Sequence, residues 1–178
     1  MNNNKVIIFG LLDTAELAYW YLKNDSKYSV EAFTVNQKYQ TVDKFKGLPV
    51  VAFEELENYF PPDEFKLFAP LTGRKMNQCR EKVYLEGKSK GYKYATYISS
   101  KSIICDNDIG ENCLILENNT IQPFTKIGNN VVLWSGNHIG HHGVIKDHVF
   151  FTSHVVMSGH CVIESYCTFG VNSTIRDY

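Results

Sequence analysis

The stretch from Ile139 to Ile163 reads IGHHGVIKDHVFFTSHVVMSGHCVI, and a large apolar residue returns in it at every sixth position. The same spacing continues in both directions along the chain. The full column comprises Ile103, Ile109, Ile115, Ile121, Ile127, Leu133, Ile139, Ile145, Phe151, Met157, Ile163, Phe169 and Ile175. A period of six fits neither an α-helix nor a coiled coil, but it is a multiple of the two-residue period of a strand. The column therefore indicates an internal repeat of short strands.

A second column lies four residues after the first, and its side chains are small or compact. Its members are Asn107, Cys113, Asn119, Thr125, Val131, Asn137, Gly143, Val149, Val155, Cys161, Cys167 and Ser173. Glycine directly follows the apolar residue at Gly110, Gly128, Gly140 and Gly170, and we expect these corners to need a positive φ.

Short flat faces with one large inward side chain each are typical of a parallel β-solenoid. The pattern resembles the hexapeptide repeat of the left-handed β-helix, in which three hexapeptides form one coil of 18 residues. It predicts about four and a half coils over residues 97–178. Ordinary alternating strands are the alternative, but they would require turn signals at irregular spacing.

The length and charge of the chain limit its function classes. Its 178 residues can hold one large or two small domains, and the repeat leaves residues 1–96 for a separate N-terminal domain. A net charge of −1 without a basic stripe disfavours nucleic acid and anionic membranes as partners. No apolar run approaches the length of a membrane span, and the N-terminus MNNNK lacks the apolar stretch of a signal peptide. We therefore expect a cytoplasmic protein without membrane insertion.

The cysteines suggest packing rather than cross-linking. Cys113, Cys161 and Cys167 fall in the column of small residues, where we expect buried free thiols. The sequence contains no CxxC pair, which excludes the commonest zinc signatures.

The N-terminal part alternates between strand and helix patterns, which predicts a small parallel sheet in a Rossmann-like α/β domain. Asp13 or Thr14 is expected to cap the first helix. The expected strands are Val6–Gly10, Val30–Val35, Leu48–Val51 and Phe65–Ala69, and the expected later helices are Glu54–Tyr59 and Arg74–Glu86.

Ligands of such sheets bind beyond the carboxyl ends of the strands. The candidate substrate-binding residues at these ends are Gly10, Asp13, Thr14, Asn36, Gly73 and Arg74. The helix N-terminus near Thr14 could receive an anion, although Leu11 and Leu12 stand where glycines would let a pyrophosphate approach. Arg74 is either a phosphate ligand or a solvated surface charge.

All six histidines fall between residues 138 and 160. His142, His148, His154 and His160 share one repeat position, so they spread around the solenoid. Only His142 and His160 share a face, one coil and about 4.8 Å apart. Hexapeptide-repeat carbonic anhydrases bind zinc between subunits through three histidines, two of them five residues apart. No pair here has that spacing, so we expect no metal.

His141 differs from the other histidines because it follows Ile139 by two residues, at a position that points outward. It is either a polar surface residue or a general base, since a neutral imidazole near pH 7 suits that role.

Three motifs carry a resemblance to a known family, and they span nearly the whole chain. They are Val6-Ile7-Ile8-Phe9-Gly10, Ile98-Ser99-Ser100 and Ile139-Gly140-His141-His142-Gly143-Val144-Ile145. The chain resembles the bacterial sugar acetyltransferases that include sialic-acid O-acetyltransferases and the bacillosamine-pathway nucleotide-sugar N-acetyltransferase. The resemblance implies an acyltransferase of surface-glycan synthesis, in which the N-terminal domain holds a nucleotide-linked sugar. It leaves both N- and O-acetylation open.

The resemblance also implies a homotrimer with acetyl-CoA along the groove between adjacent β-helices. His141 would then be the general base, and the backbone amide of Gly159 would face the oxyanion. Gly159 and His160 would contact the coenzyme and His142 the sugar.

The chain departs from this family at several points. His142 stands where the family usually places Asp or Glu, and Trp134 stands where Asn is common. Relatives continue beyond the position of Tyr178 with coils that contact the coenzyme. These departures favour the alternative of a non-catalytic trimeric scaffold or sugar-nucleotide-binding protein. A hexapeptide-repeat metalloenzyme is the third hypothesis.

Overall fold

The computed structural model describes residues 4–177, so the expectations for residues 1–3 and for Tyr178 lie outside the described chain. The chain forms two compact units. The N-terminal unit runs to Thr72 and includes Lys82–Ala95, and the C-terminal unit contains Gly73–Glu81 and the chain from Thr96 onward. None of the helices within residues 4–177 has the length and hydrophobicity that crossing a bilayer requires.

The N-terminal unit is an α/β domain, as its alternating patterns predicted. Its sheet has the strand order β3-β4-β2-β1-β5, and every pair is parallel except β3–β4. The strands are β1 (Lys5–Phe9), β2 (Ser29–Val35), β3 (Lys44–Phe45), β4 (Leu48–Ala52) and β5 (Lys66–Phe68). The helices are α1 (Asp13–Asn24) and α2 (Leu56–Tyr59), with two 3₁₀ turns, η1 (Gln37–Tyr39) and η2 (Phe53–Glu55). A third helix, α3 (Gln78–Ser89), begins in the C-terminal unit and belongs to the N-terminal unit from Lys82 onward.

The central strand β1 explains why the chain folds this way locally. Val6, Ile7 and Ile8 are fully buried, as expected of a strand covered on both faces. Ile7 packs in one apolar cluster with Phe53 and Leu67, which come from η2 and β5. A continuous apolar run therefore fixes the middle of the sheet, and the polar residues fall at its ends.

Several helix boundaries differ from the sequence prediction. The helix expected at Glu54–Tyr59 is the 3₁₀ turn η2 followed by α2, and the helix expected to end at Glu86 continues to Ser89. Leu12, not Asp13 or Thr14, is the N-cap of α1, and it makes no side-chain cap. The helix expected from Arg74 begins only at Gln78, because Lys75, Met76 and Asn77 have φ values of 50°, 50° and 65°. A right-handed helix cannot include left-handed residues.

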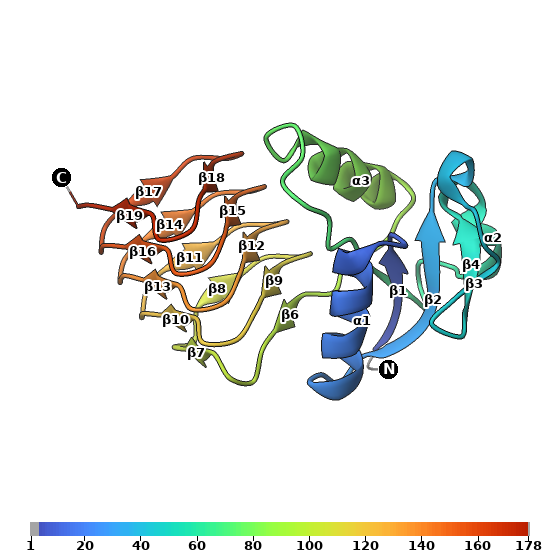
Figure 1. Ribbon diagram of the computed structural model, residues 1–178, viewed down its shortest axis with the longest axis horizontal. Coiled ribbons are helices and arrows are strands. Elements are labelled where there is room, and N and C mark those ends of the chain that lie inside the picture. Colours follow the sequence, from blue (N-terminus) through green and yellow to red (C-terminus); the bar gives the residue numbers. More distant parts are fainter. Residues whose placement is uncertain (1–3, 178) are drawn as a thin grey trace. The chain divides into compact units, whose positions relative to one another are not determined.

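The C-terminal unit is a left-handed parallel β-helix, and Figure 1 shows its coils stacked from yellow to red. Each strand pairs in parallel with the strand one coil later, as in the alignment of Thr120 with His138. The strands form three sheets with the orders β19-β16-β13-β10-β7, β17-β14-β11-β8 and β18-β15-β12-β9-β6. They are β6 (Tyr97–Ile98), β7 (Ile103–Ile104), β8 (Asp108–Ile109), β9 (Leu114–Ile115), β10 (Thr120–Ile121), β11 (Lys126–Ile127), β12 (Val132–Leu133), β13 (His138–Ile139), β14 (Val144–Ile145), β15 (Phe150–Phe151), β16 (Val156–Met157), β17 (Val162–Ile163), β18 (Thr168–Phe169) and β19 (Thr174–Ile175).

The inward column is confirmed from Ile109 to Ile175 but is wrong at its first member. Ile103 is 61% exposed, and Ile104 packs against the core in its place. The reason is the register. Ile104 aligns with Ile121, 17 residues later, whereas Ile109 aligns with Ile127, 18 residues later. The first coil therefore has one residue fewer, and this exchanges the inward and outward positions.

The positive φ angles lie in a different column from the one we expected. They occur three residues after the apolar position, not at Gly110, Gly128, Gly140 and Gly170. The residues are Asp106, Asn112, Asn118, Phe124, Asn130, Gly136, His142, His148, His154, His160, Tyr166 and Asn172. Asn, Asp and His tolerate the left-handed region better than most residues. The four regularly spaced histidines therefore occupy corners of the coil.

At three of the four glycines in the expected column, a side chain would collide with the next coil, so glycine is needed for lack of space rather than for its φ. A Cβ on Gly128 would lie 2.3 Å from Asp147 Oδ1, and one on Gly140 would lie 2.4 Å from the backbone nitrogen of Gly159. Gly110 would meet the backbone of Gly128 at 2.6 Å, whereas Gly170 has ordinary room. Close approach between coils thus explains these glycines.

The segment Gly73–Glu81 groups with the β-helix through specific contacts. Asn77 Nδ2 donates to the carbonyl oxygen of Tyr166 and to Thr168 Oγ1, both at 3.0 Å. Arg80 Nη2 donates to the carbonyl oxygen of Val149 at 3.2 Å, and the Tyr166 hydroxyl donates to Glu81 Oε1 at 2.6 Å. The left-handed turn at residues 75–77 is thus held by the β-helix corner.

Candidate active site

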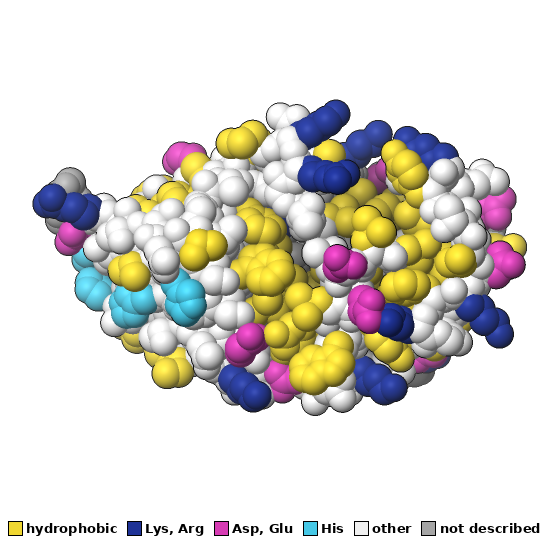
Figure 2. Space-filling model, in the orientation of Figure 1, with side chains coloured by type: hydrophobic (Ala, Val, Ile, Leu, Met, Phe, Trp, Pro, Cys, Tyr) yellow, Lys and Arg dark blue, Asp and Glu magenta, His cyan; other side chains and the backbone are white. Residues whose placement is uncertain are grey.

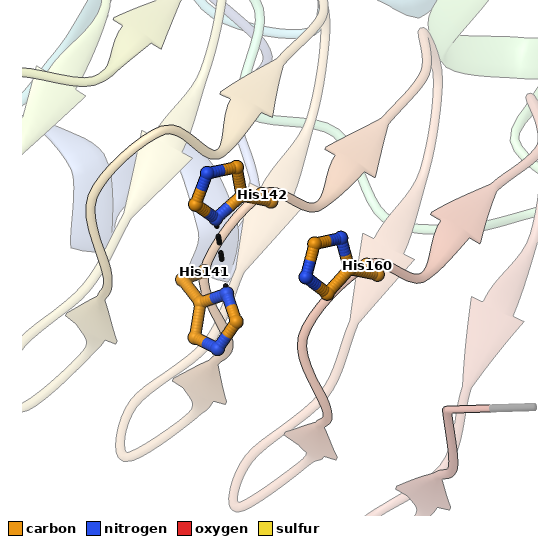
Figure 3. A group of neighbouring side chains, drawn as sticks. All are labelled: His141, His142 and His160. Atoms are coloured by element: carbon orange, nitrogen blue, oxygen red, sulfur yellow. Dashed lines mark hydrogen bonds between the residues drawn. The ribbon is translucent and has the colours of Figure 1, made fainter.

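Three imidazoles gather at one corner of two successive coils. His142 and His160 stack with centroids 5.1 Å apart and planes 14° apart, and His141 lies edge-on to both at 5.2 Å and 5.1 Å. All three are exposed. Figure 2 shows histidine side chains, in cyan, close together on the surface of the β-helix, and Figure 3 shows the three rings around a common space. The stacking of His142 and His160 confirms that they share a face.

A hydrogen bond joins His141 Nδ1 and His142 Nδ1 at 3.0 Å. One of these nitrogens must carry the hydrogen and the other must accept it. With the hydrogen on His141, its Nε2 keeps a free lone pair, which is the form that a general base needs. His142 thus occupies the position and the contact that an orienting carboxylate would have.

Gly159 lies beside the ring of His141. A Cβ at this position would be 2.9 Å from His141 Cε1 and 3.1 Å from His141 Nε2, so only glycine leaves room for the ring as it stands. Within residues 4–177 no acceptor is bonded to the Gly159 N–H, whereas one coil earlier the His141 N–H donates to Gln122 Oε1 at 3.0 Å. An open N–H therefore lies next to a candidate base.

Two further residues of this corner were missed from the sequence. Gln122 holds the backbone of His141, and the ring of Phe124 lies 4.6 Å from that of His142. The signal that could have found them is the repeat itself. A residue 18 positions earlier occupies the same corner of the preceding coil. Phe124 is therefore expected to lie beside His142, one coil earlier.

The other corner histidines lie elsewhere, as the repeat predicted. His148 is buried, and its Nδ1 accepts from Asn130 Nδ2 at 2.8 Å. Its Nε2 faces Glu81 Oε1 at 3.7 Å. Burial lowers the pKa of His148, and this effect together with Arg80 outweighs the acidic neighbours Glu81 and Asp147. The tautomer with the hydrogen on Nε2 satisfies both contacts.

The strand-end candidates of the N-terminal unit come together in part. Gly10 directly follows β1 with a φ of 120°, and its N–H donates to the carbonyl oxygen of Thr34 in β2. Asp13 and Thr14 open α1 directly after it. Asn36 follows β2, but its side-chain amide donates to Glu54 Oε1 at 3.2 Å, a contact that the sequence did not predict.

Gly73 and Arg74 do not group with these residues, because both belong to the C-terminal unit. A Cβ on Gly73 would lie 3.1 Å from Asn77 Oδ1 and 3.6 Å from the ring of Phe150. Arg74 is exposed. The left-handed turn that follows Arg74 carries this segment to the β-helix.

The prediction that the cysteines are free thiols is confirmed, and two of the three in the column of small residues are buried. All five cysteines are free; Cys113 and Cys161 are buried and Cys167 is half-buried. Burial raises the pKa of Cys113 to about 12, so this thiol is inert packing.

A family model described as bacterial transferase hexapeptide (six repeats) matches residues 108–141. This segment is a hexapeptide repeat. The matched range ends at His141, and the same six-residue period continues through the hexapeptide repeats that carry the other corner histidines. No curated protein matches the sequence significantly.

Solved structures share the hexapeptide-repeat fold together with the N-terminal unit. The acetyltransferase domain of PglB from Neisseria gonorrhoeae, in complex with acetyl coenzyme A, matches with a TM-score of 0.81 at 17% identity, over 98% of this chain and 83% of that one. WeeI from Acinetobacter baumannii matches with a TM-score of 0.78 at 19% identity, over 96% and 80%. PerB from Caulobacter crescentus, in complex with CoA and GDP-perosamine, matches with a TM-score of 0.63 at 13% identity, over 97% and 91%. At such identities the likeness establishes the fold.

Proposed function

We propose that this protein transfers an acetyl group from acetyl-CoA to an amine or hydroxyl of a nucleotide-linked sugar, with His141 as the general base. One observation carries the proposal. His141 is held through Nδ1 by His142, and its ring lies beside Gly159, whose N–H is open. A base and an oxyanion donor side by side are what acyl transfer requires.

The residues act as follows in one transfer. His141 Nε2 takes the proton from the sugar amine or hydroxyl while that atom bonds to the thioester carbonyl carbon. The Gly159 N–H donates to the oxygen that gains negative charge, a contact worth about 3 kcal/mol in comparable sites. When the carbon–sulfur bond breaks, the His141 imidazolium returns the proton to the leaving thiolate.

His142 acts through His141 rather than on the substrate in this scheme. Because it accepts the His141 Nδ1 hydrogen, it fixes the tautomer and the ring orientation of the base. Unlike a carboxylate, a neutral imidazole adds no negative charge to support the imidazolium. Phe124 covers the other side of His142, which limits its rotation.

The fold relatives support this substrate class. PglB was solved with acetyl coenzyme A and PerB with CoA and GDP-perosamine. We propose that the strand ends of the N-terminal unit hold the nucleotide part of the sugar, through Gly10, Asp13, Thr14 and Asn36. We assign Gly159 and His160 to the coenzyme. We also propose that the adjacent residues Gly73 and Arg74 contact the sugar nucleotide.

We further propose a cytoplasmic homotrimer that serves surface-glycan synthesis. Acetyl-CoA is made and used in the cytoplasm, and nucleotide-linked sugars are the activated precursors of surface glycans. Sedimentation of the purified protein would test the assembly, since a trimer has three times the chain mass of 20.4 kDa.

The test is an acetyl-transfer assay that follows release of the CoA thiol across a panel of nucleotide-linked amino and hydroxy sugars. We expect turnover with at least one acceptor, and a fall of at least about 100-fold in His141→Asn with the fold kept, judged by circular dichroism. His154→Asn is the matched control, because His154 is another exposed histidine of the same β-helix. Wild-type rates in His141→Asn would show that the base is wrongly assigned. Binding of acetyl-CoA with no turnover on any acceptor would instead favour a non-catalytic binding protein.

A further inference from the structure

The proposed transfer uses His141 as base and His142 as its partner, and it gives the third ring of the cluster only a contact with the coenzyme, not a chemical step. His160 stacks on His142 and stands edge-on to His141. One nitrogen from each of these rings lies within 4.8 Å of the other two. Within residues 4–177 this is the one group of at least three metal-ligating side chains of its kind. Three imidazole nitrogens this close together indicate that the cluster can bind a ligand other than the acetyl-transfer substrates.

The geometry is close to that of three ligands on one ion. Zinc–nitrogen bonds of about 2.0–2.1 Å in a tetrahedral site place ligand nitrogens about 3.3 Å apart. His141 Nδ1 and His142 Nδ1 are already 3.0 Å apart. The nitrogen of His160 lies within 4.8 Å of the other two, and a rotation about the side-chain bonds of this exposed residue brings it to coordination distance. Figure 3 shows the ring of His160 facing those of His141 and His142.

The backbone under the three rings is fixed. His160 N–H donates to the carbonyl oxygen of His141 at 2.9 Å, and His142 N–H donates to that of Pro123 at 3.2 Å. His142 and His160 both sit at left-handed corners with φ of 55° and 60°. The rings therefore project from the same point of two stacked coils, and only side-chain rotation is needed to adjust them.

We propose that His141, His142 and His160 bind one divalent transition-metal ion of the zinc class, with a fourth position left to water. Imidazole nitrogens suit zinc, copper and nickel, and the absence of carboxylates from the set disfavours magnesium and calcium. This site is not a cofactor for acetyl transfer. It is a competing state, because an ion on His141 removes the base. The proposal does not rest on the transfer activity, since the ion alone is its ligand.

Spacing alone did not indicate this site. The carbonic-anhydrase pattern compared in the sequence needs ligands from two subunits, whereas these three lie at positions i, i+1 and i+19 of one chain. His142 is next to His141 in sequence, but His160 comes to lie beside both only because the register at this corner is 18 residues.

The test is calorimetric titration of Zn²⁺ into tag-free full chain that has been freed of metal with EDTA and dialysed. Co²⁺ replaces Zn²⁺ in a parallel titration, because its visible absorption reports nitrogen coordination. The variants are His160→Asn and His154→Asn. Both positions have a φ of 60°, and asparagine tolerates that conformation, so each variant keeps its corner. His154 is also an exposed corner histidine but lies outside the cluster.

We expect one equivalent of Zn²⁺ to bind with a dissociation constant in the micromolar range or below. Loss of one of three ligands in His160→Asn should weaken binding by at least about tenfold, and His154→Asn should change it by less than about twofold. The proposal is overturned if no stoichiometric binding is seen at about 100 µM Zn²⁺ or if His160→Asn binds like wild type. It is equally overturned if both variants lose the same affinity. Zinc binding without acetyl transfer would support this site and count against the proposed function, and the reverse result would do the opposite.

Discussion

At the residue scale, each coil corner requires a residue with positive φ, and the side chain placed there is free to serve another purpose. Asparagine fills several corners, and histidine fills four in succession. The backbone requirement explains why histidine is tolerated at these positions. It does not explain why His141, which has no positive φ, stands next to one of them. The backbone therefore accounts for His142, whereas the presence of His141 beside it needs a functional explanation.

Gly159 gives a prediction about the base. In Gly159→Ala the new methyl group would lie 2.9 Å from His141 Cε1, so the ring must move away from its place. We expect kcat to fall at least about tenfold while the midpoint of thermal unfolding changes little, because His141 is exposed. Gly170→Ala is the control, since its methyl group meets only Ser173 Oγ at 3.9 Å. Equal activity of the two variants would contradict the assigned geometry.

His142 gives a second prediction at this scale. His142→Asp keeps an acceptor for the His141 Nδ1 hydrogen and adds a negative charge, so we expect kcat at or above the wild-type value. His142→Gly suits the φ of 55° but removes the acceptor, and we expect kcat to fall about 10- to 100-fold with little change in the KM for acetyl-CoA. The kcat and KM of both variants measure this. If Gly and Asp behave alike, His142 does not position the base.

At the element scale, polar residues one coil apart form a buried ladder. Asn112 Nδ2 donates to Asn130 Oδ1 at 2.9 Å, and Asn130 Nδ2 donates to His148 Nδ1 at 2.8 Å. Buried amides that satisfy one another in register specify how coils stack, because a slip would leave them unpaired. The apolar column alone tolerates a slip more easily, as the 17-residue step of the first coil shows.

Asparagine-to-alanine variants separate the ladder from the corner conformation. Asn172→Ala, at an exposed corner with φ of 61°, should lose only the conformational preference, about 1 kcal/mol of unfolding free energy. Asn130→Ala, with φ of 56°, should also lose two buried hydrogen bonds, for a total of about 2 to 4 kcal/mol. Urea unfolding followed by tryptophan fluorescence, from Trp20 and Trp134, measures both. Equal losses would mean that the ladder adds nothing.

At the scale of the whole molecule, the division of the chain does not follow the sequence order. Gly73–Glu81 belongs to the C-terminal unit although it lies within the N-terminal half. Its anchor combines Asn77, the buried guanidinium of Arg80 and the carboxylate of Glu81, which faces His148. Two nitrogens of Arg80, Nε and Nη1, are buried without a hydrogen-bond partner. The guanidinium of Arg80 thus contributes one hydrogen bond to this anchor, through Nη2, and two of its nitrogens are left unsatisfied.

The anchor predicts a pH dependence of stability. Because burial lowers the pKa of His148 in the folded state, the unfolded chain binds the proton more readily. The stability that depends on neutral His148 is fully present above the unfolded value, near pH 6.5, and is lost as the pH falls toward the folded value. The unfolding free energy should therefore fall more between pH 8 and pH 5.5 in wild type than in His148→Asn. A parallel fall in both proteins would exclude His148 as the source.

The sequence by itself determined the β-helix, its inward column from Ile109 onward and the parallel α/β character of the N-terminal part. These follow from short-range patterns, because each hexapeptide and each strand fixes its own conformation through local sterics and burial. Only the tertiary structure decided that Ile104 replaces Ile103, that residues 75–77 turn left-handed, and that Gly73–Glu81 joins the β-helix. It also decided that His141, His142, His160 and Gly159 meet at one corner. Neighbours in adjacent coils depend on register and on side-chain rotation, and neither is set by the residues of a single repeat.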